Sequence, residues 1–327
     1  MSRTEALQPM SPEAFSNHHE VIVIGGGIIG SLVAYTLRRA GAEVVMLDAG
    51  FDGEATRASA GMLAPYPEGL SGELLEWAEE SLALYPALVA ELQEQTGIAV
   101  PFSLEGTGLV MSRGGDRLSV WPSLASLNLQ GRSDPGGYVH PLRLKEALWQ
   151  AFQQMGGQVL RAEALFVTKG RVETDRGALL GSHIVLATGA WSGRFGLEVQ
   201  PLKGEAMWLD AAPPTIPLFL EEGYLLPRDG GLYVGATQRE GWHPGVDLIG
   251  LQWLISLVRN HFPHLETASI KAFLWGYRPM GTLQVGEIAS GIYAATGHGR
   301  NGVLLAPATA QRIAKSIFGV SPRRSRE

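Results

Sequence analysis

The chain has 327 residues, of which 45% are hydrophobic and 18% charged, a balance typical of a globular protein with a large buried core. Its formal net charge of −6 at pH 7 offers no basic surface for nucleic acid. It has no cysteine, which excludes disulfides, thiolate catalysis, cysteine-bound zinc and a flavin tethered through cysteine.

The apolar runs are short and interrupted, so we expect no membrane partner. The first 20 residues lack the apolar core of a signal peptide, and the missing cysteines favour a reducing, cytoplasmic location. We expect residues 1–17 and 321–327 to be polar tails. His18 and His19 are interpreted as solvated and no metal site is predicted, because suitably spaced partners are lacking.

The first predicted unit is a βαβ unit. Residues 21–24 are apolar throughout, as in a parallel strand covered on both faces, and a helix of regular apolar spacing follows up to Gly41. Residues 44–47 form a second buried strand that ends at Asp48. This order of strand, helix and strand indicates one half of a nucleotide-binding sheet.

The turn between the first strand and its helix fits the pattern G-x-G-x-x-G. Gly25 permits the tight turn, Gly27 lets the backbone approach a pyrophosphate, and Gly30 lets the helix pack on the strand. Asp48 can accept hydrogen bonds from ribose hydroxyls and would repel a 2′-phosphate, which disfavours NADP. The unit therefore predicts a bound dinucleotide and leaves NAD and FAD open.

The elements further along the chain alternate between helical and strand patterns. Helices are predicted over residues 72–96, from Pro141, over 248–262 and over 302–317, and strands over 106–112, 184–187, 269–277 and 292–296, with short strands within 205–238. Residues 113–137 are rich in Gly, Ser and Pro and indicate a compact connection.

This order predicts a mixed α/β (α+β) fold with a discontinuous nucleotide-binding domain and an inserted, mainly antiparallel sheet domain. The first domain is expected to take residues 18–66, 136–200 and 278–320, and the second to take residues 67–135 and 201–277.

A family resemblance is carried by segments that occur in a fixed order: GGGIIGSLVAYTL, ATRASAGMLAPYPE, IVLATGAWS, PLKGEAMWL, GYLLPRDGGLYVGAT, WGYRPMGT and ATGHGRNGVLLAPATAQRIA. Together they resemble the D-amino-acid oxidase superfamily of FAD-dependent amine oxidases, and within it the glycine oxidases, from residue 20 to about 318. The resemblance implies non-covalent FAD rather than NAD, in a Rossmann-like FAD-binding domain.

The resemblance also implies which residues hold FAD. Ile28 and Ile29 would lie at the pyrophosphate turn, and Asp48 and Ala49 near the adenosine ribose. The remaining cofactor residues it implies are Thr56, Arg57, Ala60, Gly61, Met62, Ala164, Thr188, Gly189, His298, Gly299, Arg300, Asn301, Gly302, Val303 and Leu304. The N-terminus of the last helix would face the N1–C2=O edge of the flavin and stabilise the charge of its reduced form.

For the substrate, the resemblance implies that Arg278 pairs with a carboxylate, aided by Tyr224, while Arg300 holds a substrate carbonyl oxygen or the flavin. Gln238 stands where glycine oxidases have a methionine near the substrate. Glu222 stands where a histidine is expected, and the stretch from 110 to 140 is short for the family. These departures concern the identity of the substrate and not the binding of FAD.

The implied reaction is the oxidative deamination of glycine or another small amino acid or amine. With its carboxylate on Arg278, the substrate would place its Cα–H over flavin N5, and the lone pair of a neutral amine would push hydride to N5 without a strong protein base. Oxygen would be the acceptor, giving H2O2 and an imine that hydrolyses to a 2-oxo acid or feeds thiamine thiazole synthesis.

Three other functions stay open on the sequence. They are a D-amino-acid dehydrogenase with an acceptor other than O2, a sarcosine or other N-methyl amine oxidase, and a flavin-binding protein without turnover. A homo-oligomer is compatible with the sequence.

Overall fold

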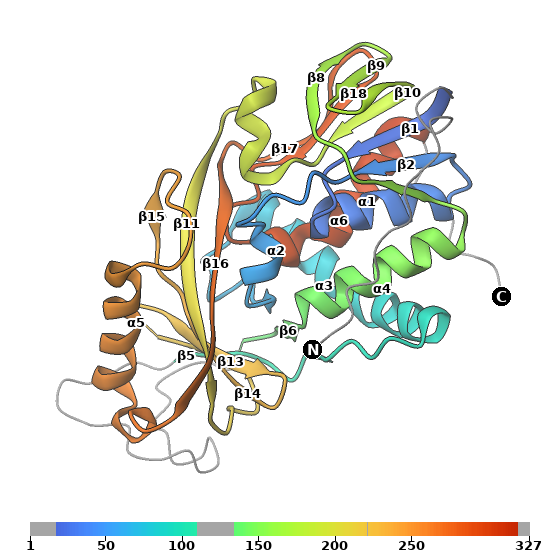
Figure 1. The fold of residues 1–327 in the computed structure, drawn as a ribbon. Helices are drawn as coiled ribbons and strands as arrows, with labels where there is room; N and C mark the ends of the chain where they lie inside the picture. Colours follow the sequence, from blue (N-terminus) through green and yellow to red (C-terminus); the bar gives the residue numbers. More distant parts are fainter. Residues whose placement is uncertain (1–17, 110–133, 221, 320–327) are drawn as a thin grey trace.

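The structure, a computed structural model, describes residues 18–109, 134–220 and 222–319 (Figure 1). It contains two large sheets, one mainly parallel and one mainly antiparallel, with helices packed against each (Figure 1). The two predicted tails and residues 113–133 of the predicted connection lie outside the described residues.

The first sheet has eight strands and follows the path β17–β18–β10–β1–β2–β7. Its strands are β17 (Gln284–Ala289), β18 (Ile292–Thr296), β10 (Gly177–Leu186), β1 (His18–Ile24), β2 (Val44–Leu47) and β7 (Gln158–Leu160), with β8 (Ala164–Thr168) and β9 (Arg171–Thr174) attached to β10. Strands β18, β10, β1, β2 and β7 run parallel, and β17 and β9 join antiparallel.

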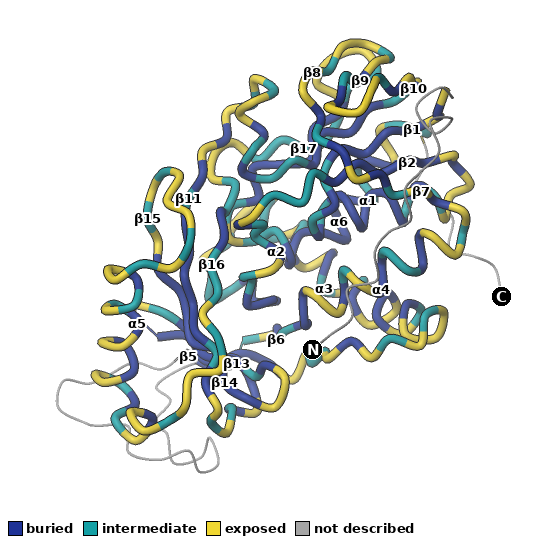
Figure 2. Tube along the Cα trace, in the orientation of Figure 1, coloured by how far each residue is buried: buried dark blue, intermediate teal, exposed yellow. Residues whose placement is uncertain are grey.

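Both faces of this sheet are covered, as the continuous apolar run 21–24 predicts, and helices cover one of them. Val21 and Val23 of β1 point into a core shared with these helices, whereas Ile22 and Ile24 point into a second core on the opposite face. The helices are α1 (Ile28–Arg39), α3 (Gly72–Thr96), α4 (Pro141–Gln154) and α6 (Gly302–Phe318) (Figure 1). Residues 21–24 of β1 and the whole of β2 are buried, while β17 and many positions of the β8–β9 hairpin are more exposed (Figure 2).

The ends of α1 follow from its sequence. It begins directly after the glycine turn with Gly27 as its N-cap, and no side chain caps it. Gly41, just past the C-cap Ala40, has φ +99°, the left-handed conformation that glycine adopts at little cost. The predicted helix and its glycine stop are therefore confirmed.

The second sheet has seven strands in the order β15–β11–β14–β13–β12–β5, and β16 pairs with β11. Its strands are β15 (Arg239–Glu240), β11 (Val199–Asp210), β14 (Gly231–Gly235), β13 (Tyr224–Arg228), β12 (Leu218–Phe219), β5 (Gly108–Leu109) and β16 (Ser269–Gly281). Helix α5 (Leu248–His261) packs Leu254, Leu257 and Val258 into the core of this sheet, which leaves the opposite face for the site.

Short elements join the two sheets. A small sheet of β3 (Met62–Leu63), β6 (Gly137–Val139) and β4 (Phe102–Ser103) lies in the chain between the two large sheets, together with α2 (Ala55–Ala58) and the 3-10 helix Gly189–Phe195. These short pieces carry much of the site described below. The 3-10 helix Pro263–Leu265 instead joins α5 to β16 beside the second sheet.

The structure corrects several sequence-based expectations. His18 and His19 are not part of a solvated tail: they open β1 and pair with Leu180 and Gly181, and His19 is buried beside Glu43. Strand β16 continues beyond residue 277 to Gly281, so Arg278 lies within a strand rather than after one. The strands β8, β9 and β17 were not predicted.

Within the described residues, no helix is both long and apolar enough to cross a bilayer. The same part of the chain holds no group of three or more histidine, aspartate or glutamate side chains that could bind a metal ion.

Candidate active site

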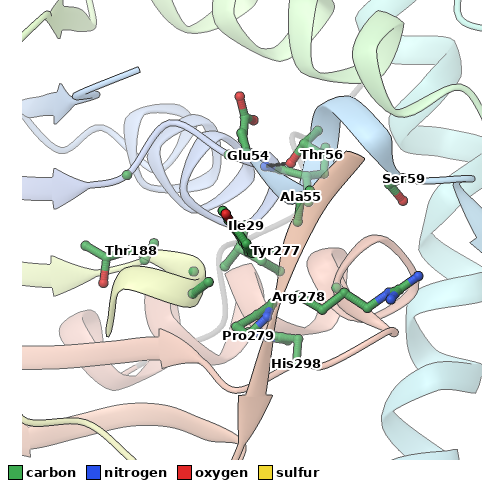
Figure 3. Close-up of a pocket in the computed structure, with 18 of the residues that line it drawn as sticks. Ile29, Glu54, Ala55, Thr56, Ser59, Thr188, Tyr277, Arg278, Pro279 and His298 are labelled. Carbon is green, nitrogen blue, oxygen red and sulfur yellow. Dashed lines mark hydrogen bonds between the residues drawn. The ribbon is translucent and has the colours of Figure 1, made fainter. Parts of the chain in front are cut away.

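A cavity of about 1620 Å³, counting its open mouth, is lined by both large sheets. The first sheet contributes the carboxyl ends of β1, β2, β10 and β18, and the second contributes residues of β13, β14 and β16. In Figure 3, Thr188 lies at one side, Glu54 lies just before α2 and Thr56 within it, and the Arg278 side chain extends from β16 away from Thr188. The cavity is therefore long, with chemically different ends.

The glycine turn forms the wall at the ends of β1 and β10. Gly25 has φ +110°, and a Cβ there would lie 2.2 Å from the carbonyl oxygen of Ala187. A Cβ on Gly30 would lie 1.8 Å from the carbonyl oxygen of Gly25. At Gly27 the nearest atom to a Cβ is Thr56 Oγ1 at 3.5 Å. The fold thus requires glycine at positions 25 and 30, whereas Gly27 borders the open cavity.

Asp48 stands at the end of β2 and is buried, with 8% of the residue exposed. Arg161 donates to Asp48 Oδ1 at 2.9 Å and to the Gly50 carbonyl oxygen at 3.2 Å. This arginine, which was not predicted, fixes the carboxylate in place through a charge-assisted hydrogen bond.

The segment from Gly53 to Gly61 passes between the two large sheets. The Tyr277 N–H donates to the Gly53 carbonyl oxygen at 2.8 Å, and the Tyr233 hydroxyl donates to the Ala58 carbonyl oxygen at 2.7 Å. The Arg228 guanidinium donates to the Ser59 carbonyl oxygen. One backbone N–H and two side chains of the antiparallel sheet therefore hold the backbone of this segment.

Arg278 lines the cavity, and its side chain extends away from Thr188 (Figure 3). Its Nη1 donates to the Thr237 carbonyl oxygen at 3.0 Å, and the Thr237 N–H in turn donates to the Glu205 carbonyl oxygen at 3.0 Å. A Cβ on Gly204 would lie 2.5 Å from the guanidinium, so the arginine lies directly on the glycine backbone. The backbone of β11 and of the connection between β14 and β15 therefore holds the guanidinium at the cavity wall.

Aromatic and charged side chains surround Arg278. The rings of Tyr224 and Tyr233 stack with centroids 6.1 Å apart and an angle of 6°, and both residues line the cavity. Arg300 pairs with Glu68 at 3.1 Å between Nη2 and Oε1. Burial raises the pKa of the Glu68 carboxyl, and the nearby guanidinium groups of Arg300 and Arg278 oppose that rise.

A family model described as FAD dependent oxidoreductase matches residues 20–316. The chain belongs to this family. Glycine oxidase of Bacillus subtilis is 32% identical to it over 92% of this chain and 93% of that protein. The crystal structure of glycine oxidase from Geobacillus kaustophilus superposes with a TM-score of 0.83 at 26% identity, covering 95% of this chain and all of that one.

Another relative is a longer protein. The "Bifunctional protein ThiO/ThiG" of Trichormus variabilis is 30% identical over 91% of this chain, which spans 52% of that relative's length. The chain thus corresponds to about half of this longer type of relative. Family membership confirms the predicted α/β fold and identifies FAD as the cofactor, which decides between the two dinucleotides that the βαβ unit left open.

The described residues fit FAD. The uncapped N-terminus of α1 and the open space above Gly27 suit a pyrophosphate, and the fixed Asp48 carboxylate suits a ribose. The predicted residues that line the cavity are Gly25, Gly27, Ile28, Ile29, Asp48, Ala49, Thr56, Ala60, Gly61, Met62, Ala164, Thr188, Gly189, Tyr224, Arg278, His298, Gly299, Arg300, Gly302 and Val303.

The other predicted site residues do not line the cavity. Gly30 is enclosed against Gly25, and Leu304 is buried in the helical core. Arg57 points outward with 63% of its side chain exposed. Gln238 is exposed, since the adjacent Thr237 takes the inward position. Asn301 caps α6 beyond the cavity lining.

Several lining residues were missed by sequence reasoning. They are Glu54, Glu68, Trp191, Gly204, Tyr233 and Tyr277. Glu68 closes the segment ATRASAGMLAPYPE, so position within a family segment was a signal for it. It also supplies a carboxylate to the part of the cavity near Arg278 and Arg300, where no acidic residue was predicted from the sequence.

His298 is predicted to make the protein less stable in mild acid. It is buried, its Nε2 lies 2.9 Å from Thr309 Oγ1, and burial lowers its pKa from 6.5 to about 4. The imidazole is neutral in the folded protein, so its stabilising contribution is complete above pH 6.5 and is lost as the pH falls toward 4. Lowering the pH from 7 to 5 should therefore reduce the free energy of unfolding by about 2 kcal/mol through His298.

Urea unfolding at both pH values checks this expectation. His298→Gln keeps a side chain that can bond Thr309 but does not titrate, so it should lose about 2 kcal/mol less than the unsubstituted protein over the same interval. Equal losses in the two proteins would contradict it.

Proposed function

We propose that this protein is an FAD-dependent amino-acid oxidase that acts on glycine or another small amino acid or amine with one carboxylate. The observation that carries the proposal is the position of Arg278 in the FAD cavity. No carboxylate of the described residues pairs with its guanidinium, which is held instead by a carbonyl oxygen. A guanidinium of this kind suits a carboxylate that arrives with the substrate.

The relatives support this activity. Two of the proteins that this chain resembles over most of its length carry the name glycine oxidase. In the proposed site, Arg278 and Tyr224 bind and orient the carboxylate, and the stacked Tyr233 supports the Tyr224 ring. When bound, FAD supplies the two-electron oxidation of a C–N bond to an imine and reoxidation by O2 that yields H2O2.

The residues proposed for FAD are the predicted cofactor residues that line the cavity. Burial of Ala60, the turn at Gly61 and the close packing of Gly204 leave a wall of small groups, which suits a flat ring. The neutral His298 beside α6 leaves the helix N-terminus as the local positive potential toward a reduced flavin. The same proposal includes the division of the chain into two domains. The FAD-binding domain takes residues 18–66, 136–200 and 278–320, and the substrate-binding domain takes residues 67–135 and 201–277.

Three further parts of the proposal concern cellular context. The likeness to ThiO/ThiG proteins supports use of the imine product in thiamine thiazole synthesis. A cytoplasmic location and a homo-oligomer stay predictions of the sequence.

Anaerobic titration of the purified protein with glycine, sarcosine, D-alanine and L-alanine tests the function. We expect the flavin absorbance near its visible maximum to bleach with at least one of them and to return with H2O2 when air is admitted. Bleaching without return in air would favour a dehydrogenase, and preference for sarcosine would favour an N-methyl amine oxidase. A yellow protein that no amine bleaches would overturn the proposal.

A further inference from the structure

Glu68 brings a carboxylate to the part of the cavity that contains the two arginines. It lies in the connection between β3 and α3, whereas Arg300 lies in the turn between β18 and α6. Only 9% of the Glu68 side chain is exposed, against 34% for Arg300, and the two atoms that join them are 3.1 Å apart. Both residues line the cavity, so the ion pair borders the space a substrate would enter.

The contacts show how the charges of Glu68, Arg300 and Arg278 balance in this part of the cavity. Glu68 interacts with Arg300 directly and with Arg278 through space. Tyr233 is neutral, since burial raises its pKa well above the usual range for tyrosine. One carboxylate therefore compensates one guanidinium, and Arg278 is left as the uncompensated charge.

We propose that Glu68 determines the charge of the accepted substrate: by pairing with Arg300 it restricts the site to amino acids with a single carboxylate. The inference rests on the proposed function, because it takes Arg278 as the group that binds that carboxylate. A second carboxylate would have to displace Glu68 from Arg300 and would then lie beside an unpaired, largely buried anion. This is specificity by repulsion rather than by an added attraction.

The substitution Glu68→Gln removes the negative charge of this side chain while keeping its shape. The amide has nearly the same size, and its oxygen can still accept from Arg300, so the connection between β3 and α3 keeps its anchor. The substitution removes the negative charge and frees the Arg300 guanidinium for a second acid group. Glu76→Gln is the matched control, since Glu76 is exposed on α3 and does not line the cavity.

The test compares glycine with iminodiacetate, a glycine whose nitrogen carries a second carboxymethyl group, as substrates of the FAD-loaded proteins. For Glu68→Gln we expect the ratio of kcat/KM for iminodiacetate to kcat/KM for glycine to rise about tenfold or more. Glu76→Gln should keep the ratio of the unsubstituted protein. A ratio that Glu68→Gln leaves unchanged would overturn the inference.

Binding of unreactive anions provides a readout that is independent of turnover. Acetate carries one carboxylate and malonate carries two, and each can be titrated into the oxidised holoenzyme while the visible flavin spectrum is followed. We expect the unsubstituted protein to prefer acetate and Glu68→Gln to shift the ratio of dissociation constants toward malonate about tenfold. Failure of either anion to bind either protein would also overturn the inference.

The two proposals can fail separately. If no amino acid bleaches the flavin but the acetate-to-malonate preference shifts as expected, the oxidase function is wrong and the charge selection by Glu68 stands. If glycine is oxidised and neither ratio moves, the function stands and Glu68 is only a structural partner of Arg300.

Discussion

Arg278→Ala is expected to lower kcat/KM for carboxylate substrates by about 2–4 kcal/mol of transition-state stabilisation, roughly 30- to 800-fold. The guanidinium lies on the Gly204 backbone and is held by the Thr237 carbonyl oxygen, so its fork is already oriented before substrate arrives. Removing it takes away both the charge and the orientation of the reacting carbon. Steady-state kinetics over a range of substrate concentrations measures the effect.

Two further variants make this result specific. Arg278→Lys keeps the positive charge but loses the planar fork, so its kcat/KM should fall between those of Arg278→Ala and the unsubstituted protein. Arg259→Ala removes an exposed arginine of α5 and should leave the kinetics as they are. The FAD content of each protein, read from its visible spectrum, must be equal for the comparison. Unchanged kinetics in Arg278→Ala would remove this residue from substrate binding.

Two substitutions in the glycine turn should affect folding and cofactor binding separately. In Gly30→Ala the new methyl group would meet the Gly25 carbonyl oxygen at 1.8 Å, so α1 must move away from β1. Forcing a group into such a packed place costs about 1–3 kcal/mol or more, which is a fall in Tm of several degrees for a chain of this size. In Gly27→Ala the methyl group fits, with its nearest neighbour at 3.5 Å, but it occupies the space proposed for the pyrophosphate.

The measurements are therefore thermal unfolding of the FAD-free proteins and titration with FAD. Gly27→Ala should melt like the unsubstituted apoprotein and bind FAD at least about tenfold more weakly, whereas Gly30→Ala should lose stability first. If Gly27→Ala bound FAD normally, the pyrophosphate could not lie where the turn places it.

The sequence was most informative where one pattern had one structural solution. The apolar run 21–24 could be covered on both faces only within a parallel sheet, and the glycine spacing and Asp48 then fixed the unit that binds a dinucleotide. The hairpin of β8 and β9 carried no such pattern, because β8 is buried at Ala164 but exposed at several following positions. Strand β17 is likewise only partly buried, so neither alternation nor a continuous apolar run marks it.

The substrate end of the site was harder to predict because it depends on contacts between distant segments. Glu68 and Arg300 are separated by 232 positions in the chain, and nothing local to either residue indicates their pairing. Gln238 illustrates a different difficulty. Alignment with a family position placed it near the substrate, but the inward position is taken by Thr237, whose hydroxyl accepts from the Glu205 N–H at 2.8 Å.

The segment from Gly53 to Gly61 has a consequence for how the protein responds to its ligands. One side of it borders the space assigned to FAD, and its carbonyl oxygens are held by Tyr277, Tyr233 and Arg228 of the antiparallel sheet. Tyr233 also stacks on Tyr224, one of the residues proposed to grip the acid group. We therefore expect a bound coenzyme to increase order in the proposed amino-acid pocket, and a bound amino acid to strengthen coenzyme binding in return.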